Sequence, residues 1–519
     1  YSLENNEGQT LEVTFRVYND GIAFKYGLKA ISDEEHIINE YTAYALPQGS
    51  KRWIQQYDPG YEKFFPLSTD GKLANRPEVD LWGYPALIEP RDSVFVLITE
   101  ANIRRGHCGS FLYNGDNRDN YQVRLGDKKL AFSGVWESPW RLLIAGSLAD
   151  ITESTLVTDV SDPSKVEDTE WIKPGMVSWI YWAYNHGSQD YQIVKEYIDL
   201  AVKMKWSYDL IDWEWDVMRN GGNIQDAVKY SLSQGVKPLV WYNSSTNWIG
   251  PGPLFRLNKK ADREKEYKWL SDMGVAGIKV DFFSGDSVST MNYYIDLLED
   301  AVKYKLMLNF HGATIPRGWQ RTYPHMMSVE GVYGAEWYNN TPVLTNRAAE
   351  HNATLPFTRN VVGPMDYTPG TFSDSQHPHI TSYGHELALP IIFESALQHM
   401  PDRPSVYYDM PEPVKKLLSD LPVAWDDTKL LAGYPGMEVV MARRKGDVWY
   451  IAGINGTNKP RTLCFLLKDL SVVGKKITLF EDGIYDRSFT IAEDLPLSED
   501  EMSVEIKCLP RGGFVAVIK

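Results

Sequence analysis

One acidic side chain stands where a β-strand should be apolar. The stretch GIKVDFFSGD, residues 277–286, predicts a short buried strand that carries Asp281 in its second half. A strand covered on both faces is normally almost wholly apolar, and a desolvated charge is costly unless it is paired. Lys279 shares a face with Asp281 because side chains alternate along a strand, so it could pair with this acid or donate to a ligand. Asp286 is expected only to cap the helix that follows.

Other polar residues stand near the ends of further predicted strands. They are Asp212, Glu214 and Asp216, then Asn243, Asn309, His311, Glu330, Glu336 and Asp366. Alternation predicts that Asp212 and Glu214 point to the same side. Any one of these residues could be a satisfied structural side chain. Their convergence favours a site, because mutually repelling carboxylates are tolerated where they bind a cation, share a proton or perform chemistry.

The chemistry that these acids favour is glycoside hydrolysis. That reaction needs two carboxyl groups, one to protonate the leaving oxygen and one to attack the anomeric carbon or activate water. The 17 Trp and 31 Tyr residues suit sugar binding or a large aromatic core. A serine hydrolase is disfavoured because the sequence lacks a G-x-S-x-G motif. The three cysteines are too widely spaced for a zinc motif, and their odd number fits no complete disulfide framework.

The bulk composition excludes several other classes. A chain of 519 residues with 43% hydrophobic content predicts more than one domain with a large core. A net charge of −16 argues against a nucleic-acid partner. No run of 18 apolar residues predicts a membrane span. The sequence starts at Tyr1 within a β-like pattern, so we expect a leader or more of the first domain to precede it.

Three sequence patterns follow one another along the chain. Residues 1–165 alternate in short runs between turn residues, which predicts an antiparallel β-sandwich. Residues 166–423 alternate strand-like with helix-like segments, and residues 424–519 return to β-structure in a small terminal sandwich. About eight β/α units favour a closed (β/α)8 barrel, with an open doubly wound sheet as the alternative. Catalytic groups of such a barrel lie at the carboxyl ends of its strands.

The barrel elements can be placed by residue number. Strands are predicted at 176–184, 208–215, 236–243, 276–283, 306–312, 326–332, 363–367 and 405–410, and helices at 190–205, 223–235, 261–274, 289–305 and 382–399.

Four stretches together resemble glycoside hydrolase family 97. They are VDFF at 280–283, HGATIPRGWQRTYP at 311–324, SVEGVYGAEW at 328–337 and HELALPIIFESALQH at 385–399. The resemblance covers essentially the whole chain and agrees with the order of the three predicted domains. It implies a calcium-dependent α-glycosidase that is periplasmic or secreted.

The resemblance also sorts the chain between two mechanistic types. In the inverting, α-glucosidase-like type, the residue after the motif's histidine is a glutamate that serves as general base; here that residue is Gly312. In the retaining, α-galactosidase-like type, an aspartate on the fourth strand is the nucleophile; here Asp281 stands there. The resemblance therefore implies Asp281 as nucleophile and Glu336 as general acid/base.

The remaining roles are carried by the same resemblance. Glu62, Glu330 and Glu336 are implied as calcium ligands, and carbonyls and waters would complete the six to eight oxygens that calcium takes. The expected substrate-binding residues are Asp212, Glu214, Lys279, His311, Gly83, Tyr84 and Trp337. The expected substrate is an oligosaccharide with a terminal α-linked sugar, with galactose favoured. An α-glucosidase or another α-glycosidase, and a non-catalytic carbohydrate-binding relative, are the alternatives.

Overall fold

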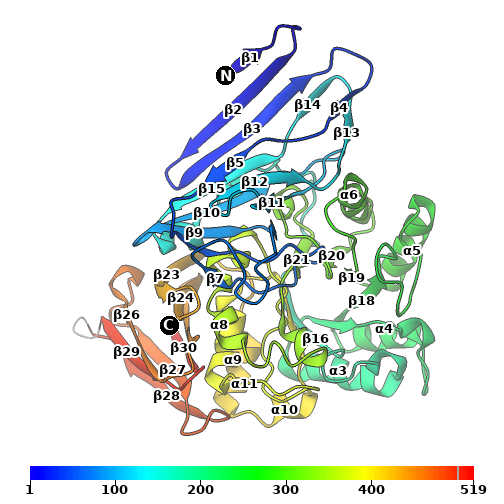
Figure 1. Cartoon of the computed structure of the whole chain (residues 1–519). Coiled ribbons are helices and arrows are strands. Elements are labelled where there is room, and N and C mark those ends of the chain that lie inside the picture. The colour runs from blue at the N-terminus through cyan, green and yellow to red at the C-terminus, as the bar shows by residue number, and fades with distance from the viewer. Residues whose placement is uncertain (499–501) are drawn as a thin grey trace.

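The computed structural model describes residues 1–498 and 502–519 in three successive regions (Figure 1). The first region is built from antiparallel sheets. The larger sheet runs in the order β1 (Ser2–Glu4), β2 (Thr10–Tyr18), β3 (Gly21–Lys29), β15 (Trp140–Gly146), β10 (Val94–Ala101), β9 (Ala86–Arg91), β6 (Lys51–Trp53) and β7 (Leu67–Ser68). A smaller sheet holds β5 (Ala43–Ala45), β12 (Asn120–Leu125), β11 (Ser110–Tyr113) and β8 (Leu81–Trp82). This β-rich domain confirms the β-structure that was predicted for the first part of the chain.

The central region is a nearly closed barrel of parallel strands. Its order is β21 (Met326–Val329), β20 (Met307–Phe310), β19 (Gly277–Asp281), β18 (Lys237–Asn243), β17 (Tyr208–Ile211), β16 (Gly175–Trp179) and β22 (Leu397–Met400). Helices α3 (Tyr191–Met204), α4 (Ile224–Ser233), α5 (Lys260–Met273) and α6 (Val288–Val302) connect successive strands. All five residues of β19 are buried, as expected for a strand covered by helices outside and by side chains within.

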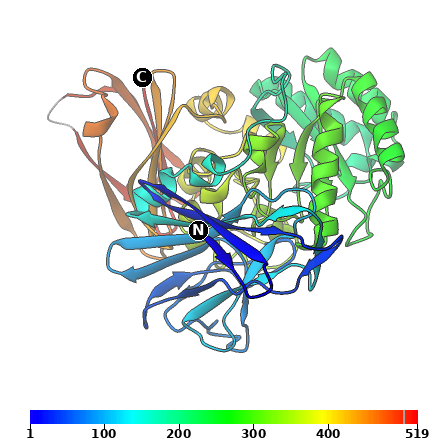
Figure 2. The ribbon, with the colours of Figure 1, turned by 90° about the horizontal axis from the view of Figure 1, so that it is seen from above.

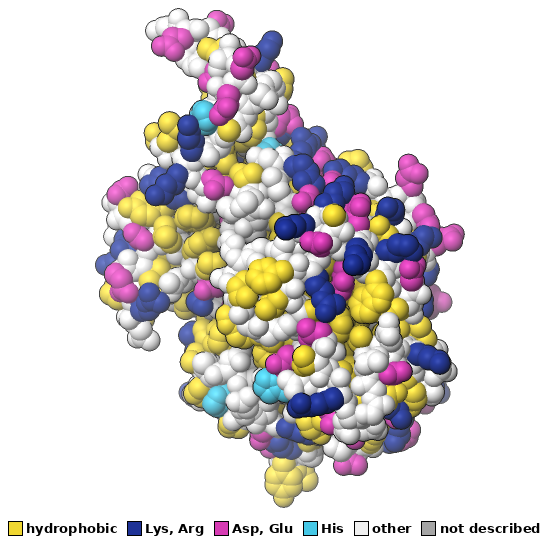
Figure 3. Space-filling model, turned by 90° about the vertical axis from the view of Figure 1, so that its right-hand side faces the viewer, with side chains coloured by type: hydrophobic (Ala, Val, Ile, Leu, Met, Phe, Trp, Pro, Cys, Tyr) yellow, Lys and Arg dark blue, Asp and Glu magenta, His cyan; other side chains and the backbone are white. Residues whose placement is uncertain are grey.

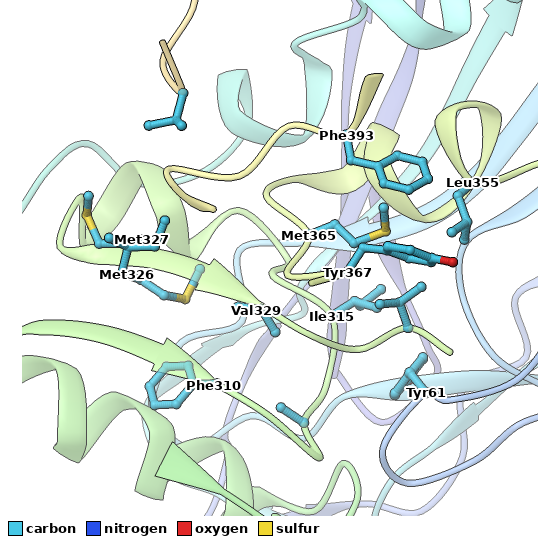
Figure 4. Packing of buried hydrophobic residues seen from close by; sticks show 14 of the residues in the cluster. Tyr61, Phe310, Ile315, Met326, Met327, Val329, Leu355, Met365, Tyr367 and Phe393 are labelled. Atoms are coloured by element: carbon cyan, nitrogen blue, oxygen red, sulfur yellow. The ribbon is translucent and has the colours of Figure 1, made fainter. Parts of the chain in front are cut away.

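The barrel has seven strands in the described residues where eight were predicted. Residues 363–367 form an extended loop instead of a strand. In that loop, the amide of Asp366 donates to the carbonyl oxygen of Val329 at 3.0 Å and the amide of Met365 donates to that of Glu394 at 2.8 Å. The loop therefore fills part of the space between β21 and β22. Figure 4 shows Met365 and Tyr367 beside Phe393 in the packed interior.

Two other predicted elements are corrected. The expected strand at 405–410 is mostly helix α10 (Pro404–Tyr408), where proline in the first turn loses no helical hydrogen bond. The expected helix at 382–399 is α9 (Tyr383–Ile392) followed by strand β22. The chain becomes extended at Phe393, and Leu397–Met400 then pair in parallel with Gly175–Ser178 of β16. The apolar run LALPIIF at 387–393 hid this break, because such a run fits a buried helix and a buried strand equally well.

The C-terminal region is an antiparallel sheet packed against the barrel (Figure 2). Its strands are β23 (Asp427–Tyr434), β24 (Glu438–Lys445), β25 (Val448–Asn455), β30 (Gly513–Ile518), β27 (Lys476–Asp482) and β28 (Phe489–Pro496), and the pair β26 (Arg461–Leu466) and β29 (Ser503–Cys508) forms a second small sheet. Helix α9 packs on β25 and β30. Arg443 fastens the two regions by donating to the carbonyl oxygens of Ile391 and Ile392.

The surface carries both signs of charge. Figure 3 shows basic and acidic side chains interspersed on one face. On α5, Lys268 and Asp272 form an ion pair at 2.7 Å. Within residues 1–498 and 502–519, every helix is too short or too polar to cross a membrane.

Candidate active site

The carboxyl ends of the barrel strands bring the predicted acids to one rim. Asp281 is the last residue of β19, Asp212 follows β17 directly, and Glu330 follows β21 directly. His311 follows β20 in the same way. Parallel strands in one sheet present these ends at a common edge, which is where barrels place their catalytic groups. The convergence that the sequence indicated is therefore present.

Asp281 is buried and held from three sides. Its Oδ2 accepts a hydrogen bond from Trp241 Nε1 at 3.2 Å and lies 3.9 Å from Lys279 Nζ, and its Oδ1 accepts one from the amide of Phe282 at 2.9 Å. Burial raises the pKa of Asp281 to about 7, although Lys279 and His311 act in the opposite direction. The carboxylate is thus oriented but still carries oxygen atoms that are free to react.

Lys279 is the positive centre of the rim. Its Nζ lies 3.4 Å from Asp212 Oδ2, and that oxygen also accepts from Trp179 Nε1 at 2.7 Å. Burial opposes the ammonium charge, but Asp212 and the neighbouring acids raise the pKa of Lys279 above its usual value. Lys279 therefore stays charged between Asp212 and Asp281; pairing was one of its two expected roles, and contact with a substrate stays a prediction.

Glu336 lies in the short 3₁₀-helix η3 (Ala335–Asn339) in the loop after β21. Its Oε2 is buried, 3.6 Å from His311 Nδ1, and makes no hydrogen bond within the described residues. Although burial favours the protonated form, Lys279 and His311 lower the pKa of Glu336.

Two further carboxylates, those of Glu330 and Glu62, lie close to Glu336. Glu330 Oε1 lies 3.4 Å from His311 Nδ1, while its Oε2 accepts from the amide of Gly312 at 2.7 Å. One ligand atom from each of His311, Glu330 and Glu336 lies within 4.8 Å of the others. Glu62 enters from the N-terminal domain, and burial together with the charges of Glu330 and Glu336 raises its pKa well above the usual range.

This cluster fits a hard divalent cation. A bound dication would relieve the repulsion that raises the pKa of Glu62, and it would give the unpaired Oε2 of Glu336 a partner. Oxygen ligands from carboxylates are the type that calcium takes. Glu62 also accepts from Trp337 Nε1 at 2.7 Å, so Trp337 orients this carboxylate.

Asp366 supports His311 from behind. Its Oδ2 forms hydrogen bonds with His311 Nε2 at 2.7 Å and Asn309 Nδ2 at 2.6 Å. The same oxygen lies 2.9 Å from His399 Nδ1. Burial opposes ionisation of Asp366, yet the two histidines hold its pKa well below the usual range. Sequence reasoning placed His399 in a helix and so missed it, because LQHM shows no apolar–polar alternation that would mark a strand.

The loop of Glu62 is fixed by a buried polar cluster between the domains. Tyr61 Oη donates to Asp286 Oδ2 at 2.7 Å, and Arg317 lies 3.1 Å from Asp286 Oδ1 and 2.8 Å from Glu100 Oε1. Asp286 was expected to cap α6, but Ser287 is the N-cap residue and accepts from the amide of Thr290. Sequence reasoning had no signal for this cluster, because its members meet only when the domains dock.

Glu214 and Asp212 were predicted to point to the same side, and the structure places them differently. Strand β17 ends at Ile211, and Glu214 has a left-handed backbone with φ of 64°, so strand alternation no longer applies. Its Oε2 pairs with His186 Nδ1 at 2.6 Å and accepts from Gln189 Nε2 at 2.7 Å. Glu214 therefore pairs with His186 in the loops that follow the barrel strands.

The expected substrate-binding residues Gly83 and Tyr84 are buried in the N-terminal domain. The Tyr84 side chain is completely buried, and its Oη lies 3.5 Å from Ser110 Oγ inside the N-terminal domain. A Cβ at Gly83 would lie 3.2 Å from the Tyr61 ring and 3.3 Å from Gln55. Both residues pack against neighbours in the domain interior, and their role in substrate binding stays a prediction.

Comparisons with known proteins place this site in a family. Sequence models described as "Glycosyl-hydrolase 97 N-terminal", "Glycoside hydrolase 97" and "Glycosyl-hydrolase 97 C-terminal, oligomerisation" match residues 1–163, 174–332 and 424–519. The chain belongs to glycoside hydrolase family 97. It is therefore a glycoside hydrolase, as the resemblance implied. The exact domain boundaries after residues 165 and 423 stay predictions.

Two curated relatives of this family 97 enzyme cover most of its length. A "Probable retaining alpha-galactosidase" of Streptomyces bingchenggensis is 34% identical over 87% of this chain and 69% of its own. A "Retaining alpha-galactosidase" of Bacteroides thetaiotaomicron is 29% identical over 98% and 83%. Among solved structures, a beta-arabinopyranosidase is 30% identical with a TM-score of 0.92, over 99% of this chain and 86% of that one.

Proposed function

We propose that the protein is a calcium-dependent retaining exo-α-glycosidase that releases terminal α-linked galactose. The observation that carries this proposal is the contact between Asp281 and Gly312. A Cβ at Gly312 would lie 3.0 Å from Asp281 Oδ1, and Gly312 has a φ of 47°, which L side chains rarely adopt. The place where a general base would stand is thus taken by the Asp281 carboxylate. A direct attack by Asp281 replaces the activated water.

The reaction follows two displacements. In the first, an oxygen of Asp281 attacks the anomeric carbon while Glu336 gives its proton to the glycosidic oxygen. The carbon–oxygen bond breaks, the aglycone leaves as an alcohol, and a glycosyl ester of Asp281 forms. In the second, the Glu336 carboxylate takes a proton from water as that water attacks the same carbon. The sugar leaves with its original configuration and Asp281 is regenerated.

Lys279 and the metal cluster set the charges for these steps. Substrate hydroxyls that accept from Lys279 weaken its pull on Glu336, and this favours the protonated form that the first step needs. The carboxylates of Glu62, Glu330 and Glu336 would hold Ca²⁺, which when bound would supply positive charge beside the acid and a binding site for sugar hydroxyls. Asp212 and His311 face the same space and are proposed to contact the sugar. The Trp337 indole supports this set by holding Glu62.

The test replaces the nucleophile and offers a substitute. Asp281→Gly should lose turnover of nitrophenyl α-galactoside, and azide should restore it while forming β-galactosyl azide. The matched control is Asp216→Gly, which removes an exposed carboxylate in the turn after β17; it should stay active without azide. Absence of rescue in a folded Asp281→Gly variant removes Asp281 as the nucleophile.

A second specificity is supported by the solved relative named beta-arabinopyranosidase. β-L-Arabinopyranose has the ring configuration of α-D-galactopyranose and lacks only the hydroxymethyl group on C5. Nitrophenyl α-D-galactoside, α-D-glucoside and β-L-arabinopyranoside should be compared by kcat/KM. A clear preference for α-D-galactoside supports the proposal, and a preference for either other substrate replaces it. The family resemblance supports a periplasmic or secreted location, which is likewise a proposal.

A further inference from the structure

An exposed tryptophan stands beside the nucleophile. Trp248 belongs to the loop between β18 and α5, and half of its surface (50%) is exposed. Its ring centroid lies 4.7 Å from that of Phe282, the residue after Asp281, and 6.0 Å from that of Trp213, the residue after Asp212. Exposed single hydrophobic residues are common, but here three aromatic rings adjoin one another directly at the rim.

The backbone around Trp248 is built to hold it in place. Asn243 is the register partner of Asp281 in the sheet, and its Nδ2 donates to the carbonyl oxygens of Trp248 at 3.1 Å and Pro251 at 3.3 Å. A Cβ at Gly250 would lie 2.6 Å from the indole, so only glycine lets the chain pack this closely. The ring is thereby fixed before a ligand arrives.

The same loop is tied to the segment that carries the nucleophile. Ser244 Oγ donates to the carbonyl oxygen of Phe282 at 2.7 Å, and Asn247 Nδ2 donates to that of Phe283 at 3.3 Å. Preorganisation of this kind lowers the entropic cost of binding. A loop fixed to the residues after Asp281 can therefore hold a ligand in register with the reacting carbon.

We propose that Trp248, with Phe282 and Trp213, forms the aglycone subsite. This proposal rests on the proposed function, because it assigns the leaving-group side of that same site. The buried groups Lys279 and Asp212 lie on the inner side, where the sugar to be cleaved is held, so the leaving group points toward solvent. An indole face packs well on the C–H face of a pyranose or on an aryl ring. The ligand class is thus a neutral sugar or aryl aglycone.

The test compares substrates that differ only in the leaving group. An α-galactosyl disaccharide has a sugar aglycone, whereas α-galactosyl fluoride has none. Trp248→Ala should lower kcat/KM for the disaccharide about tenfold, equivalent to about 1.4 kcal/mol, and leave that for the fluoride unchanged. Trp248→Phe should restore most of the loss. Tyr485→Ala, which removes a side chain that is 73% exposed in the C-terminal domain, should change neither value.

The outcomes separate this subsite from the overall function. Equal losses on both substrates, or no loss on either, overturn the subsite. If the unaltered enzyme cleaves β-L-arabinopyranosyl substrates and no α-galactosyl one, the galactose specificity fails. The subsite is then judged by the same comparison between an arabinopyranosyl disaccharide and the corresponding fluoride.

Discussion

Gly312→Ala tests whether Asp281 needs the space that a glycine leaves. The added Cβ would lie 3.0 Å from Asp281 Oδ1 and from the Phe282 amide nitrogen, closer than nearly all real Cβ contacts. Positive φ, here 47°, adds about 1 to 2 kcal/mol of backbone cost for a residue other than glycine. The nucleophile or its supporting amide must then shift. Because small displacements of reacting groups cost large factors in rate, we expect kcat on nitrophenyl α-galactoside to fall about tenfold or more.

Gly285→Ala separates backbone strain from displacement of the nucleophile. Gly285 has a φ of 70°, but a Cβ there would meet only Tyr57 Oη at 3.5 Å and Pro59 at 3.7 Å. Both variants should therefore lose similar stability, measured as thermal unfolding, while Gly285→Ala keeps kcat within about twofold. Equal kcat in the two variants would refute the reasoning that Gly312 makes room for Asp281.

Two further outcomes concern metal and pH. Removal of calcium with a chelator should reduce activity at least tenfold and lower the unfolding temperature, with both restored by Ca²⁺; full activity in protein shown to be metal-free by elemental analysis would contradict this. Burial lowers the pKa of His325 to about 4. The buried neutral imidazole therefore contributes stability that is fully present above about pH 6.5. This stability is lost as the pH falls toward 4, by up to about 1.4 kcal/mol per pH unit. Between pH 7.5 and 5.5 the unfolding temperature of His325→Gln should therefore fall less than that of the unaltered protein. An identical fall in both proteins would contradict this role of His325.

Local sequence predicted the elements whose signals are complete within them. Strand β18 was predicted at 236–243 and lies at Lys237–Asn243, and α3 was predicted at 190–205 and lies at Tyr191–Met204. Asp190 caps α3 by accepting from the amide of Gln192, and turn residues bound the strand on either side. The positions of Asp281 and Lys279 followed from the same alternation, because β19 stays regular through Asp281.

The failures share a physical cause, which is that contacts outside the segment decide them. Glu214 left the predicted face because β17 ends at Ile211, and nothing in YDLIDWEW marks that end. The pairing of Tyr61 with Asp286 forms only when two domains dock. Strand alternation and motif spacing carry no information about such contacts.

The choice between two mechanisms reduces to which strand end supplies the second carboxylate. The Asp281 oxygen and a side chain at Gly312 compete for one volume, since a single added carbon would already lie at 3.0 Å. A carboxylate at one position therefore excludes a large side chain at the other. In the proposed retaining arrangement the acid on β19 attacks the sugar directly, and no acid after β20 is needed to activate water. Gly312 is thus as much a part of the retaining arrangement as Asp281 itself.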